Sequence, residues 1–265
     1  VVISCERSEQ VKPDIGLQFY SLRKQFENDV PGTLKMISDW GIAKIEGGDT
    51  YGVPLEEFKA LLLENNLQVV SVGADYNDLK TQPEKVIRNA KSFGASYAMC
   101  PWIPHQEDEF TFDDAKMAVD LFNSAGKLLA DEGIELVYHP HGYEFRPYGQ
   151  GNLFDYMLEN SENFDFEMDV YWFTHGGADP LAYLNAHPDQ FKLLHLKDMQ
   201  IGVLGNDTGH EDVETNVELG TGQIDIVQLV IRARELGIEY MFIEDESSSV
   251  VDQVPESLEF LANIP

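Results

Sequence analysis

Acidic and imidazole side chains follow several short apolar runs of this sequence, where they could meet in one site. The run from Phe191 to Asp198 is too short for an apolar helix, and its polar residues His195 and Lys197 lie toward its C-terminal end. This pattern is typical of a buried parallel strand that carries a functional site at its tip. Polar residues at equivalent places in other runs are Gln18, Glu46, His139 with His141 and Glu144, Asp169, and Glu244 with Glu246.

The chemistry that these residue types favour is metal binding. Carboxylates gathered in one buried mouth repel one another, and a divalent cation removes that conflict. Carboxylate oxygens with one or two imidazoles suit one Mn²⁺, Co²⁺, Zn²⁺ or Mg²⁺ ion and leave positions for substrate oxygens. The alternatives are ion pairs to Lys44 and Lys197, and a core histidine at His195 that is satisfied by a hydrogen bond. Few basic residues lie near these positions, so we favour the metal.

Eight strand-like runs alternate with eight helical patterns after residue 13. The predicted strands cover residues 14–20, 42–46, 67–74, 96–100, 134–139, 164–170, 191–196 and 240–243. The predicted helices cover residues 29–40, 54–65, 84–93, 113–132, 153–160, 179–186, 224–236 and 254–261. This alternation predicts an α/β fold with a single closed (β/α)8 TIM barrel, in which all strand C-termini meet on one face. Residues 197–221 are predicted to form a long functional or mobile loop.

The composition restricts the partners of the protein. Its 265 residues include 18 Lys and Arg against 47 Asp and Glu, which gives a formal net charge of −29. This balance argues against nucleic acid and anionic membranes, and it makes a neutral sugar at least as acceptable as a phosphorylated one. No apolar run reaches the roughly 20 residues of a membrane helix. A homo-oligomer is left open.

Residues 1–13 are predicted to be a polar leader ahead of a barrel domain at residues 14–265. The first five residues, Val1 to Cys5, could be the remnant of a trimmed export or lipoprotein segment, or a plain disordered terminus. Both a cytoplasmic and an exported location in a bacterium are therefore left open.

Five runs of the chain resemble the sugar phosphate isomerase/epimerase family, within the xylose-isomerase-like TIM barrel superfamily. They are Gly16 to Arg23, Tyr138 to Phe145, Met168 to Trp172, Leu194 to Asp198, and Phe242 to Asp245. The His-Leu-Lys-Asp and His-x-His-x-x-Glu-Phe runs are the most distinctive, and the resemblance covers nearly the whole chain from Asp14. It implies a divalent metal held by Glu, Asp, His and Glu at the ends of four strands.

Three of these four metal positions are matched by Asp169, His195 and Glu244. The fourth departs from the pattern, because many relatives carry a glutamate where this chain has His139. We expect Glu144 to serve as the fourth ligand, with His139 as the alternative and otherwise a substrate contact.

The resemblance implies an isomerase or epimerase that moves a proton next to the carbonyl of a sugar, keto-sugar or cyclitol through an enediolate. The expected catalytic residues are Glu144, Glu244, His141 and Lys197. The expected substrate contacts are Gln18, Tyr20, Glu46, Trp102, His139 and Trp172, where aromatic rings can stack on sugar faces.

Other functions are kept as alternatives. If His139 replaces a glutamate, a one-base lyase, dehydratase or hydratase acting on a keto-sugar or keto-glycoside becomes more plausible. An abasic-site endonuclease and a non-catalytic carbohydrate-binding barrel are the remaining candidates. The other histidines are predicted to be surface or loop residues: His105, His175, His187 and His210.

Overall fold

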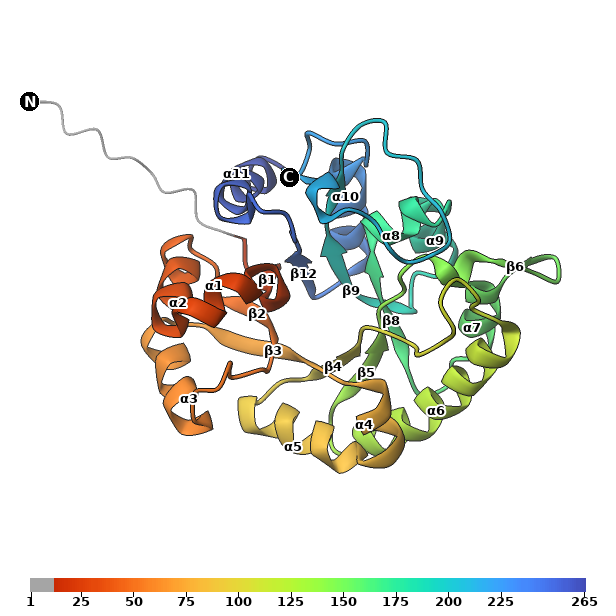
Figure 1. The fold of residues 1–265 in the computed structure, drawn as a ribbon, viewed down its shortest axis with the longest axis horizontal. Coiled ribbons are helices and arrows are strands. Elements are labelled where there is room, and N and C mark those ends of the chain that lie inside the picture. The colour runs from red at the N-terminus through yellow and green to blue at the C-terminus, as the bar shows by residue number, and fades with distance from the viewer. Residues whose placement is uncertain (1–11) are drawn as a thin grey trace, which may run out of the picture.

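The structure is a computed structural model that describes residues 12–265. Eight parallel strands close into a barrel in the order β1-β12-β9-β8-β5-β4-β3-β2, with helices around the outside (Figure 1). The barrel strands are β1 (Ile15–Gln18), β2 (Lys44–Gly47), β3 (Gln68–Gly73), β4 (Tyr97–Cys100), β5 (Glu135–Tyr138), β8 (Asp165–Asp169), β9 (Phe191–Leu196) and β12 (Tyr240–Ile243). The predicted TIM barrel and its eight strands are confirmed.

Eight of the α-helices correspond to the predicted ones. They are α2 (Val30–Asp39), α3 (Leu55–Glu64), α5 (Pro83–Phe93), α6 (Phe112–Ala130), α7 (Leu153–Asn160), α9 (Pro180–Ala186), α10 (Ile226–Leu236) and α11 (Val250–Ala262). Three short helices were not predicted: α1 (Arg23–Asn28), α4 (Tyr76–Thr81) and α8 (Val170–His175). Each has six residues, which is too few for an apolar period of 3.6 residues to stand out.

Several short elements lie on the C-terminal face of the barrel. The segment after β9 was predicted to lack regular structure, yet β10 (Asp198–Met199) pairs with β11 (Asn216–Val217), and a single turn of 3-10 helix, η3 (Val213–Thr215), precedes β11. Two more 3-10 turns, η1 (Phe19–Leu22) and η2 (Tyr143–Phe145), follow β1 and β5, and β6 (Pro147–Tyr148) pairs with β7 (Gly151–Asn152). Within residues 12–265, no helix has the length and apolar composition needed to span a membrane.

The inside of the barrel is apolar at one end and polar at the other. A small buried cluster comprises Val70, Tyr97, Met99, Val137, Leu193 and Phe242. On β9 and just beyond it, Leu193, His195 and Lys197 alternate with residues that face the outer layer, and all three are buried. The same strand therefore contributes an apolar side chain to the core and then two polar side chains to the mouth.

Candidate metal centre

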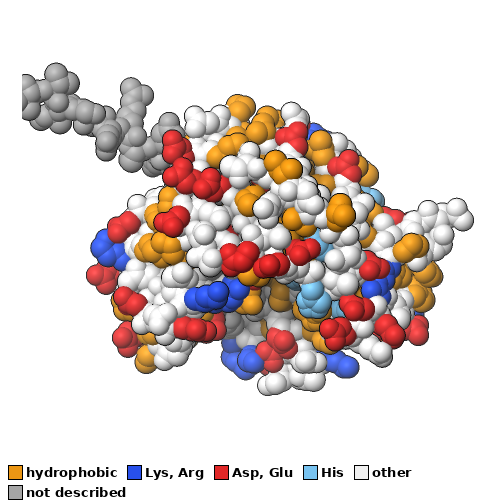
Figure 2. All heavy atoms as spheres, turned by 45° about the horizontal axis from the view of Figure 1, so that its top comes forward, with side chains coloured by type: hydrophobic (Ala, Val, Ile, Leu, Met, Phe, Trp, Pro, Cys, Tyr) orange, Lys and Arg blue, Asp and Glu red, His pale blue; other side chains and the backbone are white. Residues whose placement is uncertain are grey.

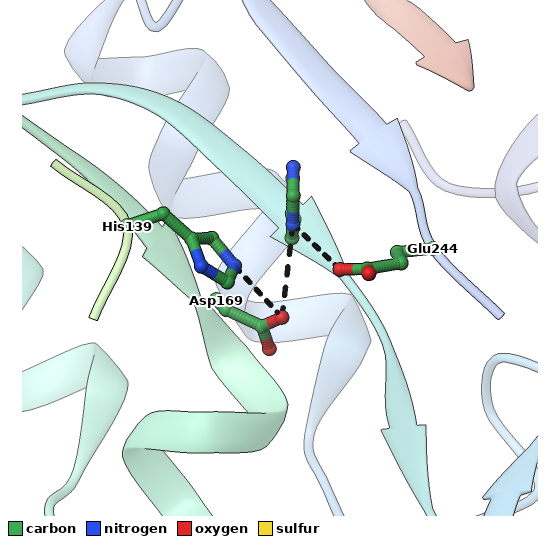
Figure 3. Close-up of side chains that lie close together, drawn as sticks. His139, Asp169 and Glu244 are labelled. Carbon is green, nitrogen blue, oxygen red and sulfur yellow. Dashed lines mark hydrogen bonds and ion pairs between the residues drawn. The ribbon is translucent and has the colours of Figure 1, made fainter. Parts of the chain in front are cut away.

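Four consecutive strands of the barrel deliver four polar side chains to one point. The strands β12, β9, β8 and β5 are neighbours in the sheet, and Glu244, His195, Asp169 and His139 lie at or just beyond their C-terminal ends. One ligand atom of each side chain lies within 4.8 Å of those of the other three, and all four residues are buried. Figure 3 shows the side chains of His139, Asp169 and Glu244 pointing toward one another.

Several atoms in this cluster approach closely without a hydrogen bond. His195 Nδ1 and Glu244 Oε2 lie 2.7 Å apart as an ion pair, yet neither atom makes a hydrogen bond. Because buried polar atoms almost always have partners, such convergent orphaned atoms indicate a place for a cation. Two imidazoles and two carboxylates are donors that Zn²⁺, Mn²⁺ and Co²⁺ accept, so the residues fit one divalent metal ion.

The helix α8 orients Asp169. The Oδ1 atom of Asp169 accepts hydrogen bonds from the backbone N–H groups of Tyr171 (2.8 Å) and Trp172 (3.1 Å). Its Oδ2 atom is left to face His139 Nε2 at 3.2 Å and His195 Nδ1 at 3.7 Å. Burial alone would raise the pKa of Asp169, but its contacts with the two histidines hold that pKa well below its usual value. Asp169 is therefore an anionic ligand at neutral pH.

Glu244 and Lys197 form a charged pair beside the cluster. Lys197 Nζ lies 4.0 Å from Glu244 Oε1 and 2.7 Å from Glu246 Oε1. Burial opposes ionisation of Glu244, but the charges of Lys197 and His195 lower its pKa to about 2. Burial likewise opposes the charge on Lys197, whose pKa is nevertheless raised by Glu244 and Glu246. Both groups therefore carry their charge at neutral pH.

A second layer of carboxylates lies on the other side of the His195 ring. His195 Nε2 is 2.6 Å from Glu46 Oε1 and 3.3 Å from Glu167 Oε1, and both glutamates are fully buried. Gln18 Nε2 (2.7 Å) and Ser71 Oγ also donate to the carboxylate of Glu46. Burial opposes the charge on His195, but Glu167 and Glu244 raise its pKa well above its usual value, so the ring is protonated in the metal-free protein. A bound metal ion would displace the proton on Nδ1, while Nε2–H donates to Glu46.

The prediction that Glu144 is the fourth ligand is corrected by its surroundings. Its carboxylate accepts hydrogen bonds from the Tyr138 hydroxyl and from the backbone N–H groups of His141 (3.1 Å) and Gly142 (2.8 Å). Its oxygens are thus occupied by these donors, and Glu144 is not among the four residues of the cluster. His139, which was expected to contact substrate, takes the fourth position in the cluster instead.

Two further expected substrate contacts face the protein interior. Glu46 lies beneath His195, and the Gln18 side chain is used at both ends, since its Nε2 donates to Glu46 and its Oε1 accepts from the Tyr20 N–H. Both residues therefore support the site from below. Glu167 was not predicted at all, although strand alternation signals it, because it lies two residues before Asp169 and so shares its face of β8.

The remaining expected substrate contacts surround the mouth. Acidic side chains gather around a hollow in which histidine is visible (Figure 2). The ring of His141 lies between Trp102 and Trp172, with centroid distances of 5.2 and 5.4 Å, and its Nδ1 has no partner. Trp172 itself is buried under the Lys197 ammonium group, whereas Tyr20 is 52% exposed at the rim. Trp102, Trp172 and Tyr20 remain predicted substrate contacts, and His141 remains a predicted catalytic residue.

Two other expectations are corrected. His175 was predicted to be a surface or loop residue, but it is buried and its Nε2 lies 2.9 Å from Glu211 Oε2. Lys44 was considered as a partner for a site carboxylate, but it lies at the N-terminal end of β2 and bonds the Gln68 side chain there. Lys44 is thus at the opposite end of the barrel from the cluster.

A comparison with known families agrees with this geometry. The model of the xylose isomerase-like TIM barrel family matches residues 34–264. The chain belongs to this family. Members of the xylose isomerase-like TIM barrel family are enzymes, among them isomerases, epimerases and dehydratases.

Individual relatives within the family carry different activities. An inosose dehydratase from Clostridium beijerinckii is 29% identical over 96 residues, which is 36% of this chain and only 32% of that protein. A sugar phosphate isomerase/epimerase from Parabacteroides distasonis superposes with a TM-score of 0.78 at 25% identity, over 96% of this chain and 99% of that one. The IOLI protein, solved with a bound zinc atom, shares the fold with a TM-score of 0.70 at 14% identity, over 94% and 95% of the two chains.

Proposed function

We propose that the protein is a divalent-metal-dependent enzyme that removes the proton next to the carbonyl of a keto-sugar or cyclitol and then eliminates a β-hydroxyl or β-alkoxyl group. The observation that carries this proposal is the composition of the cluster, in which His139 joins Asp169, His195 and Glu244 while Glu144 is bound elsewhere. Epimerisation with two carboxylate bases on opposite faces of the substrate would need a second glutamate at the position of His139. The dehydratase relative supports the same choice.

The residues around the cluster suit this reaction. The metal, when bound, would polarise the carbonyl oxygen and lower the cost of the enolate. Glu244, ionised at neutral pH, would accept the proton from the carbon next to the carbonyl, whose electron pair then forms the enolate. The electrons return to expel the β-oxygen, which takes back the proton held by Glu244 and leaves as water or an alcohol. The persistent positive charge of Lys197 would stabilise the developing oxyanion by hydrogen bonding.

Isomerisation or epimerisation is the second candidate, because one further group could carry a proton. His141 is partly exposed at the mouth and its Nδ1 has no partner. Burial, followed by the nearby His139, lowers the pKa of His141 well below its usual value, so the ring is neutral at physiological pH. A neutral imidazole on the second face of the substrate could return the proton there. The Parabacteroides distasonis relative is consistent with this alternative.

The two candidates are separated by following substrate in D2O. The metal-loaded protein is incubated with inososes and 3-keto-glycosides, and the products are identified by mass spectrometry and NMR. Elimination releases water or an alcohol and yields an enone, whereas epimerisation conserves the formula and incorporates deuterium. Asp169→Asn should abolish turnover, while Asp165→Asn, at the other end of the same strand, should retain it. Turnover that survives Asp169→Asn and exhaustive chelation would disprove the metal-dependent mechanism.

The same samples test the less favoured functions. A non-catalytic carbohydrate-binding barrel would be stabilised by sugar without any dependence on added metal. Cleavage of an abasic DNA duplex would indicate an endonuclease, a function that the net charge of −29 opposes.

A further inference from the structure

The loops that bind phosphate in many (β/α)8 barrels follow the seventh and eighth strands, which are β9 and β12 in this chain. After β9, the backbone N–H groups are already bound by one buried carboxylate. Asp198 Oδ2 accepts from the N–H groups of Gly220 (2.9 Å) and Gly222 (3.0 Å), and its Oδ1 accepts from those of Met199 (2.8 Å) and Ile224 (3.2 Å). An internal anion thus occupies the amides that could otherwise hold a phosphate.

Backbone N–H groups of the loop after β12 are likewise occupied by carboxylates. The N–H of Ser247 donates to Asp245 Oδ1 at 2.8 Å. Both the N–H (3.0 Å) and the hydroxyl (2.8 Å) of Ser248 donate to the carboxylate of Glu214, which comes from the loop after β9. The N–H groups of Ser247 and Ser248, which precede helix α11, are therefore also bound by carboxylates of the protein itself.

The basic side chains that contact the mouth are neutralised as well. Glu246 lies between them, with Oε1 at 2.7 Å from Lys197 Nζ and Oε2 at 3.2 Å from Arg23 Nη2. Lys197 also has Glu244 at 4.0 Å. A phosphate dianion placed here would meet two carboxylates and two cations whose charge is already compensated.

We infer that the substrate carries no phosphate or other anionic group at this side of the mouth and is an uncharged keto-sugar, keto-glycoside or cyclitol. The class of substrate in this inference rests on the proposed function. The exclusion of phosphate, in contrast, rests only on the charges and hydrogen bonds of the loops after β9 and β12. In these loops the protein supplies its own anions at the positions where a sugar phosphate would need donors.

Calorimetric titration of the metal-loaded protein tests the inference with matched ligand pairs. The probes are D-fructose with D-fructose 6-phosphate, D-ribulose with D-ribulose 5-phosphate, and inorganic phosphate alone. We expect each phosphate monoester to bind at least about tenfold more weakly than its parent sugar, and inorganic phosphate not to bind at millimolar concentration. A monoester that binds more tightly than its parent would overturn the inference. If no sugar or inosose binds, the proposed function fails. The titration with inorganic phosphate still decides whether these loops exclude phosphate.

A variant that removes one negative charge tests the inference through an increase in phosphate affinity. Glu246→Gln leaves Lys197 and Arg23 without their shared partner, so we expect its affinity for inorganic phosphate to rise at least about tenfold over that of the wild type. The matched control is Asp207→Asn, a residue of the loop after β9, which changes the charge equally and leaves the half-buried guanidinium of Arg146 without its carboxylate partner. An equal gain in both variants, or phosphate binding by the wild type as tight as by Glu246→Gln, would contradict the inference.

Discussion

The two nitrogens of His195 have different tasks. Nδ1 faces Asp169 and Glu244 in the candidate metal centre, while Nε2 lies 2.6 Å from Glu46 in the layer below. A histidine ligand is commonly oriented by a carboxylate on its other nitrogen, which fixes the tautomer and makes the free nitrogen a better donor to the metal. Glu46 therefore supports His195 from the side away from the candidate metal centre.

We predict that Glu46→Gln weakens metal binding by about 10- to 100-fold, because the amide is a poorer acceptor for the Nε2–H group of His195. Competition with a chelating dye measures the affinity, and ¹⁵N NMR of the zinc-loaded protein reports which nitrogen of the ring carries the proton. The control is Glu135→Gln, an exposed position at the start of β5. Unchanged affinity in Glu46→Gln would show that the carboxylate does not orient His195.

Glu144 makes stability depend on pH. Burial raises its pKa from 4.5 to about 7 despite the hydrogen bonds that it accepts. A carboxyl group whose pKa is raised on folding stabilises the protein fully below its unfolded pKa, and this contribution is lost as the pH rises through its folded pKa.

Between pH 4.5 and about pH 7.5, we therefore expect the free energy of unfolding of the wild type to fall relative to that of Glu144→Gln, by up to about 3 kcal/mol. Urea unfolding at several pH values measures the difference. The exposed substitution Glu159→Gln on α7 serves as the control and should give a curve parallel to that of the wild type. Parallel curves for Glu144→Gln would refute the prediction.

At the scale of elements, the segment after β9 is organised by one side chain. Four backbone N–H groups converge on Asp198, two of them from glycines more than twenty residues away along the chain. Through Glu214 and Asn216 the same segment also bonds the loop after β12, since the Ser248 and Glu246 N–H groups donate to these side chains. This long loop is thus fastened to the mouth and forms part of its wall.

We predict that Asp198→Asn lowers the free energy of unfolding by about 2–4 kcal/mol, because an amide cannot accept all four hydrogen bonds and turns its own N–H groups toward donors. Amide hydrogen exchange at Gly220 and Gly222 should accelerate together with this loss. Asp212→Asn is the control, since this exposed residue accepts one local hydrogen bond from the Glu214 N–H. Equal effects of the two changes would mean that Asp198 does not anchor the loop.

At the scale of the whole molecule, the barrel gathers carboxyl groups from several strands into one buried region. Asp169, Glu244 and Glu46 lie there with His195 and Lys197 as neighbouring positive charges, while burial and the adjacent Glu46 raise the pKa of Glu167 well above its usual value. An ion that binds the folded chain alone also stabilises it through mass action.

We expect chelation to lower the melting temperature of the metal-loaded wild type. The free energy of unfolding should fall by roughly 2.7 kcal/mol if the free metal concentration before chelation was about 100-fold above the dissociation constant. Differential scanning calorimetry with and without chelator, followed by readdition of metal, measures the effect. Asp169→Asn should melt at the same temperature in both conditions. A wild type that is equally insensitive would argue against a bound metal.

Much of this architecture is predictable from local patterns. Strand and helix periods account for the barrel, because alternation of apolar runs with amphipathic segments leaves few other folds. Because parallel strands end on one face, the pattern placed Asp169, His195 and Glu244 among the polar residues of that face, and the resemblance to the family then implied that they bind the metal. Strand alternation would also have found Glu167, two residues before Asp169.

The fourth position of the cluster depends on contacts between segments. At Gly142 the backbone has a φ of 97°, and a Cβ there would lie 3.0 Å from the Trp172 carbonyl oxygen. This turn folds the chain so that Glu144 reaches the Tyr138 hydroxyl, and His139 is left facing Asp169. Sequence spacing alone gives no measure of that turn.

The order of apolar and polar residues along the chain was enough to specify a closed barrel and the face on which chemistry could occur, and the resemblance to the family added three side chains of the candidate centre. Which donor completes the centre, and which anions occupy the loops after β9 and β12, depended on the folded coordinates. The physical reason is that a repeating period is a local property of the chain, whereas the partner of a buried charge is set by segments that meet only after folding.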